Sequence, residues 1–235
     1  MKSKEDFLEG QILLIDKPLE WTSFQAVNAV RWAIRRAFNL KKIKVGHAGT
    51  LDPLATGLLL ICTGKFTKRI SELQGQNKEY TGTITLGATT PSYDLETEID
   101  QRFPTDNISP EAIYQAAGQL TGTLEQLPPV FSALKKDGKR LYEYARDGKE
   151  VALKARTIEI LSFEITAIQI PEVQFKVQCG KGTYIRSLAH DFGQILGCGA
   201  HLSELRRTKI GDYNVDNSLA PKDFSERLTT KNIKA

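Results

Sequence analysis

The chain has 235 residues, of which 40% are hydrophobic, and a formal net charge of +4. This length allows one large domain or two small ones, and the composition is that of a globular protein. The charge is too small by itself to indicate a nucleic-acid partner. The first apolar run, Ile12–Ile15, is too short for a signal peptide or a membrane span, so we expect a cytoplasmic protein.

The cysteines argue against a metal or disulfide framework. Cys62, Cys179 and Cys198 are scattered along the chain without metal-ligand spacing. An odd, sparse count is typical of a reducing compartment, and the apolar runs around Cys62 and Cys179 predict buried thiols. There is no nucleotide-binding fingerprint either, so we expect no metal and no cofactor.

The first predicted elements are a buried strand over Gln11–Asp16 and a helix that begins after Thr22. Thr22 with Gln25 three residues later has the spacing of a capping box. The helical period places one apolar face on the following residues: Phe24, Val27, Val30, Ile34 and Phe38.

A basic run overlaps the end of this helix. Six basic residues and no acidic one lie between positions 31 and 44: Arg31, Arg35, Arg36, Lys41, Lys42 and Lys44. Such a run is commonly a solvated face, but basic groups elsewhere in the chain also make a phosphate-binding surface plausible.

The stretch GHAGTLDPLATGLLLICTGKFTK, residues 46–68, is the centre of the functional prediction. Pro53 pushes Asp52 out of the α region, which places its carboxylate on extended or turn backbone. A helix start is the competing interpretation, with Asp52 as the N-cap and Pro53 at the first helical position. The two interpretations are compatible, because a cap can hold a carboxylate still while one oxygen faces a cleft.

This stretch resembles motif II of the bacterial tRNA pseudouridine synthase B (TruB) family, with Ala48 where threonine is usual. Members of that family make pseudouridine at uridine-55 in the T arm of tRNA. The resemblance implies that Asp52 is the catalytic aspartate and that His47 contacts the flipped-out uridine. A lone histidine is more often structural, and only its place in the motif favours this role.

The next segments extend the resemblance. Residues 80–86 alternate between two faces, as a strand does. One interpretation of Tyr80, at the start of this strand, is a residue at the edge of the core. The segment NKEYTGTITLG resembles a family segment, and that resemblance implies instead that Tyr80 is a catalytic-site residue that stacks on the target base. Asp94 falls at the last aspartate of the family's T-D-T-x-D segment and is a candidate substrate contact. Pro91 and Ser92 depart from that pattern.

Residues 110–120 are predicted as a helix, followed by strands near 157–166 and 173–179. Between them, QLPPVFSALKKDGKRLYEYARDGKEV resembles a further family segment. Lys135 and Arg146 within it become candidates for contact with RNA or substrate, and solvated surface charge is the alternative for Arg146.

The segment GTYIRSLAHDFG leads into a helix whose apolar side holds Ile185, Leu188, Ala189, Phe192 and Ile195. Arg186 and Asp191 lie off that stripe. The resemblance implies that Arg186 pairs with the catalytic Asp52 and that Tyr184 borders the base. By the same resemblance, AHLSELRRTKIGDY places Leu205 against the base, while Arg206 and Arg207 meet RNA.

The resemblance covers about residues 10–225 and implies an α+β fold with a single pseudouridine-synthase-like domain over residues 1–235. We expect a mixed, mostly antiparallel sheet flanked by helices, a short polar tail over Thr229–Ala235 and no PUA domain. The implied partner is the T-arm stem–loop of tRNA, with no guide RNA and no membrane, and we expect a monomer.

The implied reaction breaks the N1–C1′ bond of uridine and joins C5 to C1′, after the base has been extruded from the RNA. Whether Asp52 attacks a carbon or accepts a proton stays open. Two other classes are possible. A non-catalytic tRNA-binding module would not need Asp52 paired with Arg186, and a nucleoside hydrolase normally uses a second carboxylate or a metal, for which the sequence has no spacing.

Overall fold

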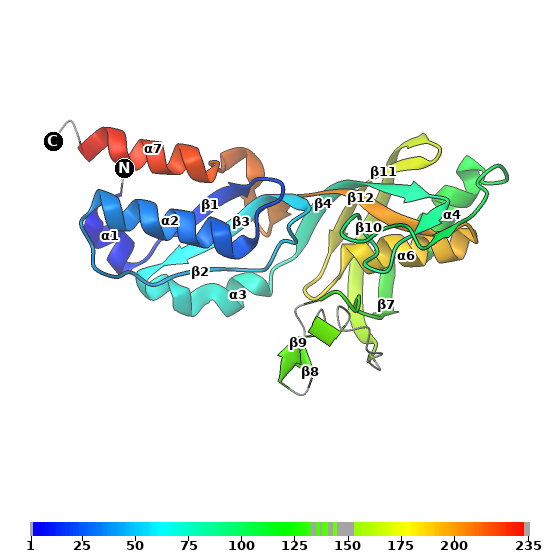
Figure 1. Ribbon diagram of the computed structural model, residues 1–235, viewed down its shortest axis with the longest axis horizontal. Helices are drawn as coiled ribbons and strands as arrows, with labels where there is room; N and C mark the ends of the chain where they lie inside the picture. Colours follow the sequence, from blue (N-terminus) through cyan, green and yellow to red (C-terminus); the bar gives the residue numbers. More distant parts are fainter. Residues whose placement is uncertain (1, 133–134, 137, 141–142, 145–152, 233–235) are drawn as a thin grey trace. The chain divides into compact units, whose positions relative to one another are not determined.

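The computed structural model describes residues 2–132, 135–136, 138–140, 143–144 and 153–232 (Figure 1). The helices are α1 (Lys4–Glu9), α2 (Ser23–Ala37), α3 (Ile70–Gln74), α4 (Pro110–Gln119), α6 (Ile185–Leu196) and α7 (Pro221–Asn232). The longer strands are β1 (Ile12–Lys17), β3 (Ala55–Thr63), β4 (Lys78–Leu86), β7 (Gly122–Gln126), β10 (Arg156–Gln169), β11 (Glu172–Cys179) and β12 (Ala200–Ile210). Short strands are β2 (Val45–His47), β5 (Ala88–Thr89), β6 (Gln101–Arg102), β8 (Lys135–Lys136), β9 (Lys139–Arg140) and β13 (Tyr213–Asn214).

The chain divides into two compact units. Unit 1 consists of Met1–Glu79 and Arg206–Ala235, and unit 2 consists of Tyr80–Leu205. β4 and β12 each contribute residues to both units. The single domain over residues 1–235 stays a prediction.

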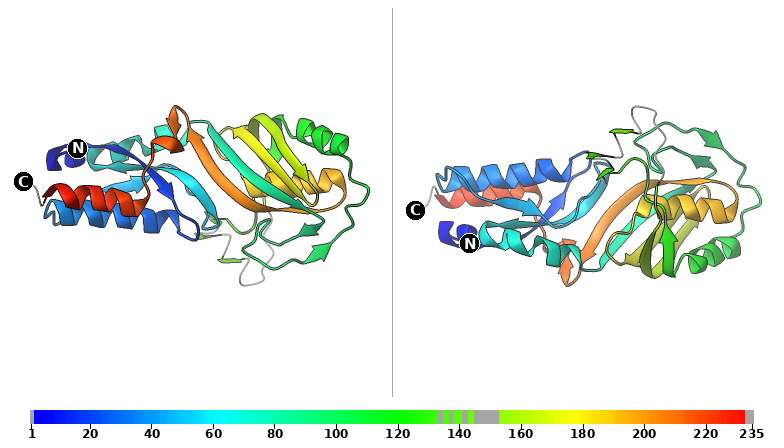
Figure 2. Two further views of the ribbon diagram at one scale, coloured as in Figure 1. Left: turned by 90° about the horizontal axis from the view of Figure 1, so that it is seen from above. Right: turned by 90° about the horizontal axis from the view of Figure 1, so that it is seen from below.

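Unit 1 is built on β3, which pairs antiparallel with both β1 and β2. Because successive side chains of a strand point to opposite faces, β3 serves two apolar clusters. Leu59 and Ile61 pack with α2 and α7, whereas Leu58 and Leu60 pack with Leu73 of α3. Figures 1 and 2 show α2 and α7 lying side by side over the first of these faces.

In unit 2 the strand order is β12-β4-β11-β10-β7. β10 pairs antiparallel with β11 along most of its length and with β7 at its start. α4 and α6 contact each other, and Phe192 of α6 packs against Phe163 of β10, which meets Phe175 of β11 edge-on. The α+β fold with a mixed, mostly antiparallel sheet and flanking helices is confirmed.

Most of the predicted elements are present, with bounds shifted by a residue or two. The capping box is confirmed, because the Gln25 amide donates to Thr22 Oγ1 at 3.1 Å and the Thr22 amide donates to Gln25 Oε1 at 2.7 Å. The placement of Phe24 is wrong, since its side chain is 63% exposed. The buried face of α2 instead starts at Ser23, whose hydroxyl oxygen accepts from the Leu51 amide.

The end of the described chain is helical. The predicted polar tail begins within α7, which continues to Asn232. α7 buries only two large apolar side chains, Phe224 and Leu228, one helical turn apart against the core of unit 1. Two such residues in a polar segment give too weak a periodic signal to predict a helix.

Candidate active site

In unit 1, Asp52 lies in the loop that residues 48–54 form between β2 and β3. β2 and β3 pair antiparallel, with His47 opposite Ile61, so the loop connects two neighbouring strands of the sheet. No helix begins at Asp52, because the chain turns and enters β3 at Ala55; the predicted helix start is wrong. The half-buried Asp52 therefore lies on turn backbone, as the following proline favours.

A buried lysine holds the end of this loop. Lys17 is completely buried, and its Nζ donates to the carbonyls of Pro18 at 2.9 Å, Trp21 at 2.6 Å and Pro53 at 3.3 Å. The Glu20 amide donates to the same Pro53 carbonyl at 2.8 Å. Burial lowers the pKa of Lys17 to about 8. Lys17 was not predicted as a site residue, although its place between an aspartate and a proline after the first strand was a signal.

His47 is half-buried at the end of β2. Burial lowers the pKa of its imidazole below the ordinary value, and the positive charge of Arg207 lowers it further. The ring is therefore neutral near pH 7, which suits contact with an uncharged base.

The two adjacent arginines of β12 have different environments. Arg206 forms a two-pronged ion pair with Asp16, with Nη1 and Nη2 at 3.0 and 2.7 Å from the carboxylate oxygens, and it is partly exposed. Arg207 is 1% exposed and donates to backbone carbonyls of unit 1. The prediction that Arg207 meets RNA is wrong, because its guanidinium is not accessible.

In unit 2, α6 brings Arg186 and Asp94 together. Both are buried, at 4% and 5% exposed, and Arg186 Nε lies 3.5 Å from Asp94 Oδ2. Arg186 also donates to the carbonyls of Ser92 at 3.1 Å and Phe131 at 2.9 Å. The expectation that Arg186 lies off the buried side of the helix is wrong. Its pairing with Asp52, which belongs to unit 1, stays a prediction.

The loop that carries Asp94 is fixed on two successive turns of α6. Ser92 and Asp94 contact Arg186, while the ring of Tyr93 stacks on His190 one turn further, with centroids 4.0 Å apart. Tyr93 has a positive φ of 64°, which is uncommon for a non-glycine residue and turns the chain so that consecutive residues face the same helix. Ser92, one of the departures from the family pattern, is thus one of the groups that hold Arg186.

The other predicted contacts lie in different surroundings. Tyr80 is 8% exposed in β4, and Leu205 is half-buried in β12. Tyr184 caps α6, and its main-chain amide and carbonyl bond to the Gln126 side chain at 2.9 and 3.1 Å. Lys135 lies in β8, and Arg146 falls outside the described residues. Their contacts with a base or with RNA stay predictions.

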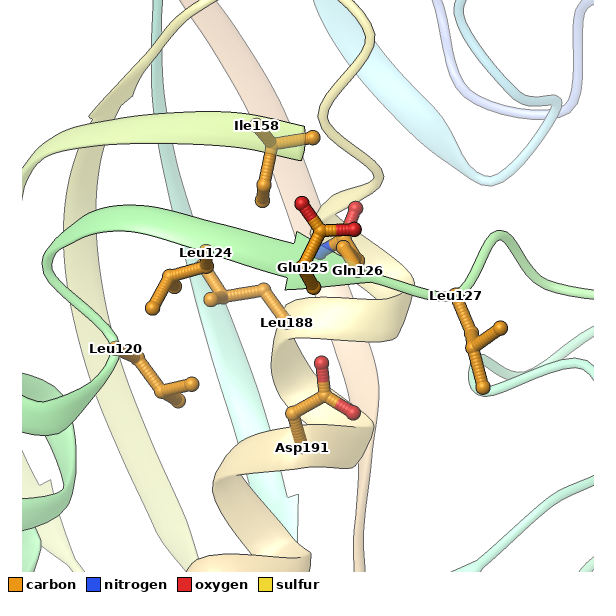
Figure 3. Close-up of a pocket in the computed structure, with 8 residues that line it drawn as sticks. All are labelled: Leu120, Leu124, Glu125, Gln126, Leu127, Ile158, Leu188 and Asp191. Atoms are coloured by element: carbon orange, nitrogen blue, oxygen red, sulfur yellow. The ribbon is translucent and has the colours of Figure 1, made fainter. Parts of the chain in front are cut away.

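A cavity of about 270 Å³ opens in unit 2 between β7 and α6 (Figure 3). Four of its eight lining residues are leucines, and Figure 3 shows the Asp191 carboxyl group pointing from α6 toward β7. Burial raises the pKa of Asp191 to about 6. None of the predicted site residues lines this cavity, although Gln126, whose side chain bonds to the Tyr184 main chain, does.

The described residues contain no group of three or more histidine, cysteine, aspartate or glutamate side chains placed to hold a metal ion. Within the same part of the chain, no helix combines the length and the apolar character needed to cross a membrane.

Comparisons with known proteins match nearly the whole chain. The family model described as TruB family pseudouridylate synthase (N terminal domain) matches residues 35–185, and the model described as tRNA pseudouridylate synthase B C-terminal domain matches residues 186–232. The tRNA pseudouridine synthase B of Flavobacterium johnsoniae is 62% identical over 225 residues, which cover 95% of this chain and 98% of that protein. The protein of the same name from Phocaeicola vulgatus is 53% identical over 228 residues, covering 97% of each.

Solved structures at lower identity share the fold. A Cbf5–Nop10–Gar1 complex contains a chain that is 28% identical, with a TM-score of 0.70 over 96% of this chain. A chain of an H/ACA RNP bound to a substrate RNA containing 2′-deoxyuridine is also 28% identical, with a TM-score of 0.67 over 94% of this chain. The match spans only 56% and 53% of those two longer chains.

Proposed function

The chain belongs to the TruB family of pseudouridylate synthases, and from that premise we propose that it converts uridine-55 in the T loop of tRNA to pseudouridine. The observation that carries the proposal is the placement of Asp52. It is the acid of the family motif, and it lies on a turn whose backbone is bound by two buried cations, Lys17 and Arg207. A carboxylate held in this way is suited to act at the sugar of a bound nucleotide.

The reaction needs no external reagent. The N1–C1′ bond breaks, the uracil rotates, and C5 bonds to C1′ while the proton on C5 leaves and N1 gains one. Substrate and product are isomers, so neither a redox equivalent nor a phosphate donor is consumed. Asp52 serves either as the nucleophile or as the proton acceptor, and both roles require an ionised carboxylate at a fixed position.

Arg186 is proposed to meet Asp52 in the active enzyme. A guanidinium can bind a carboxylate through two parallel hydrogen bonds, which fixes its orientation as well as its charge. Asp94, Ser92 and Phe131 already restrict the rotation of the Arg186 side chain. This restriction removes much of the entropy cost of ordering a long side chain at the moment of substrate binding.

The target uridine is stacked within folded RNA and has to be extruded before the carboxylate can reach it. We propose that the neutral ring of His47 contacts the extruded base and that Tyr80 stacks on it, with Tyr184 and Leu205 bordering it. Lys135 and Asp94 are the further proposed contacts. The partner is the T-arm stem–loop, bound directly by a monomer in the cytoplasm without a guide RNA and without a cofactor.

The test is incubation of the purified protein with a T-arm stem–loop transcript, followed by nucleoside analysis. The proposal predicts pseudouridine at position 55 and none in a matched transcript with cytidine there. Release of free uracil would instead indicate a hydrolase. Binding of the transcript without any change in its nucleosides would indicate a non-catalytic RNA-binding module.

A further inference from the structure

Arg207 is the largest fully buried side chain of the described residues. It lies in β12, in the part of that strand that belongs to unit 1. An arginine with so little exposure is unusual, because removing a guanidinium from water is costly unless its donors are satisfied. Its surroundings therefore need a specific explanation.

The donors of Arg207 bridge two segments. Nε donates to the Leu58 carbonyl of β3 at 2.7 Å. Nη2 donates to the Gly49 carbonyl at 3.1 Å, and Nη1 lies 3.4 Å from the Thr50 carbonyl. Gly49 and Thr50 are in the loop that carries Asp52, whereas Leu58 is in the strand that follows it. The planar guanidinium thus fixes the start of the loop against β3.

The backbone around Arg207 is also tightly packed. Gly57 of β3 has a φ of +103°, and a Cβ atom there would lie 2.3 Å from the Arg207 carbonyl oxygen. β3 and β12 therefore approach so closely that only glycine fits at this position. This close packing holds the Arg207 backbone in place, and so limits the positions that its guanidinium can take at the loop.

Lys17 completes the arrangement from the other end of the loop, where its Nζ lies 3.3 Å from the Pro53 carbonyl. The loop is held by Arg207 at residues 49 and 50 and by Lys17 at residue 53, with Asp52 between. None of the carbonyl acceptors neutralises the two cations, and the charge of Lys17 interacts with that of Asp52.

We propose that Arg207 is a positioning residue for the reaction, which holds the Gly49–Thr50 backbone so that Asp52 keeps its catalytic orientation, and that it does not contact RNA. This inference rests on the proposed function of Asp52. It assigns to a buried arginine a role that its place in a basic, RNA-binding sequence motif did not suggest.

The experiment compares R207Q, R207K and the wild type in single-turnover conversion of the T-arm stem–loop at saturating protein. We expect R207Q to be ~10- to 100-fold slower, because small displacements of a catalytic group have effects of this size. R207K should fall between the two, since an ammonium keeps the charge but lacks the planar fork of donors. The Kd of each variant for the stem–loop should stay within about threefold of the wild type, with the same salt dependence.

Two controls separate positioning from general destabilisation. Ile34→Val alters a fully buried side chain of α2, in a core cluster that contains no residue of the loop, and should leave the single-turnover rate unchanged at a temperature where every variant is folded. Hydrogen exchange should be faster at the amides of residues 48–52, 54 and 55 in R207K than in the wild type, with α2 and α7 unaffected. This second readout remains informative if R207Q does not fold.

An R207Q rate within threefold of the wild type would overturn the proposal, as would unchanged exchange of the loop amides in R207K. Weaker binding of the stem–loop, together with a slope of log K against log salt that is smaller in magnitude by about one, would instead indicate that Arg207 contacts an RNA phosphate. If the wild type makes no pseudouridine, the proposed function fails, whereas the exchange experiment still tests whether Arg207 holds the loop.

Discussion

At the scale of single residues, buried charges surround the groups proposed to do the chemistry. Lys17 and Arg207 lie next to the Asp52 loop of unit 1, and Arg186 and Asp94 form an ion pair in unit 2. Burying such groups is unfavourable unless they are paired or hydrogen-bonded, so stability alone is a poor reason for their presence. The three cations donate to backbone carbonyls of loops that carry a candidate site residue, and Asp94 accepts from the Glu96 amide within its own loop, which indicates that these charges serve to fix the loops.

Arg186→Ala should reduce turnover much more than it reduces RNA binding. Removing one partner of a buried pair typically costs about 3–5 kcal/mol, in part because it leaves the other charge unpaired. Arg186→Lys should restore only part of the rate, since an ammonium does not reproduce the guanidinium fork that contacts Asp94, Ser92 and Phe131. Single-turnover rates and Kd values for the stem–loop measure the two effects, and near wild-type turnover in the Ala variant would rule out the proposed role.

Lys17 should give the stability of the protein a measurable pH dependence. Its pKa is lowered to about 8 in the folded state from 10.5. Between these values the unfolded chain binds more protons, so the Lys17 contribution to the free energy of unfolding rises with pH across the window. Urea unfolding of the wild type and Lys17→Met at pH 7.5 and 9.5 tests this prediction. The free energy of unfolding of the wild type, relative to that of Lys17→Met, should be higher at pH 9.5 than at pH 7.5. An equal difference between the two proteins at both pH values would contradict the prediction.

At the scale of elements, α2 presents a basic and aromatic outer face. Trp32 is 57% exposed, and the guanidinium of Arg36 lies 5.1 Å from the centroid of its ring. Arg35, Lys41 and Lys42 are exposed as well. The helix itself contains no acidic residue. The helix therefore offers an RNA backbone basic and aromatic side chains without an acidic side chain of its own.

Stem–loop binding should therefore weaken steeply with salt. With about four to six phosphate contacts overall, the slope of log K against log salt should be about −3 to −5. Neutralising Arg35, Arg36, Lys41 and Lys42 together should make that slope shallower. A control variant that neutralises two exposed lysines on α1 and α7, Lys4→Gln with Lys222→Gln, should leave the slope unchanged. If the variant with all four basic residues neutralised keeps the wild-type slope in an equilibrium titration, this basic run is an ordinary solvated face.

At the scale of the whole molecule, the fold and the central motif could be predicted because they depend on local signals. The capping box, the alternating strands and the Gly-rich run around Asp52 are each contained within a few residues. The Arg186–Asp94 ion pair could not be predicted, since its partners are far apart in the sequence and are brought together only by the packing of α6 on the loop. The burial of Arg207 was unpredictable for the same reason, because its acceptors lie in β3 and in the preceding loop.

The departures from expectation have a common physical origin. Phe24 has a helical spacing that fits the apolar face, but the start of α2 packs its Ser23 side against Leu51 and leaves Phe24 exposed. Arg206 and Arg207 are adjacent in the sequence, but their side chains point to opposite faces of β12. Arg206 pairs with Asp16, whereas Arg207 is buried. Residue type and spacing predict which side chains share a face, whereas the neighbouring elements decide which face is covered.

The most direct test of the central claim is single-turnover conversion of the T-arm stem–loop by Asp52→Asn. The amide keeps the size of the side chain but loses its charge and basicity, so the turn should persist while the chemistry fails. We predict no detectable pseudouridine, a Kd within roughly tenfold of the wild type, as expected when phosphate contacts supply most of the affinity, and an unchanged circular-dichroism spectrum. Conversion by the variant at more than a few per cent of the wild-type rate would contradict the assignment of Asp52 as the catalytic group.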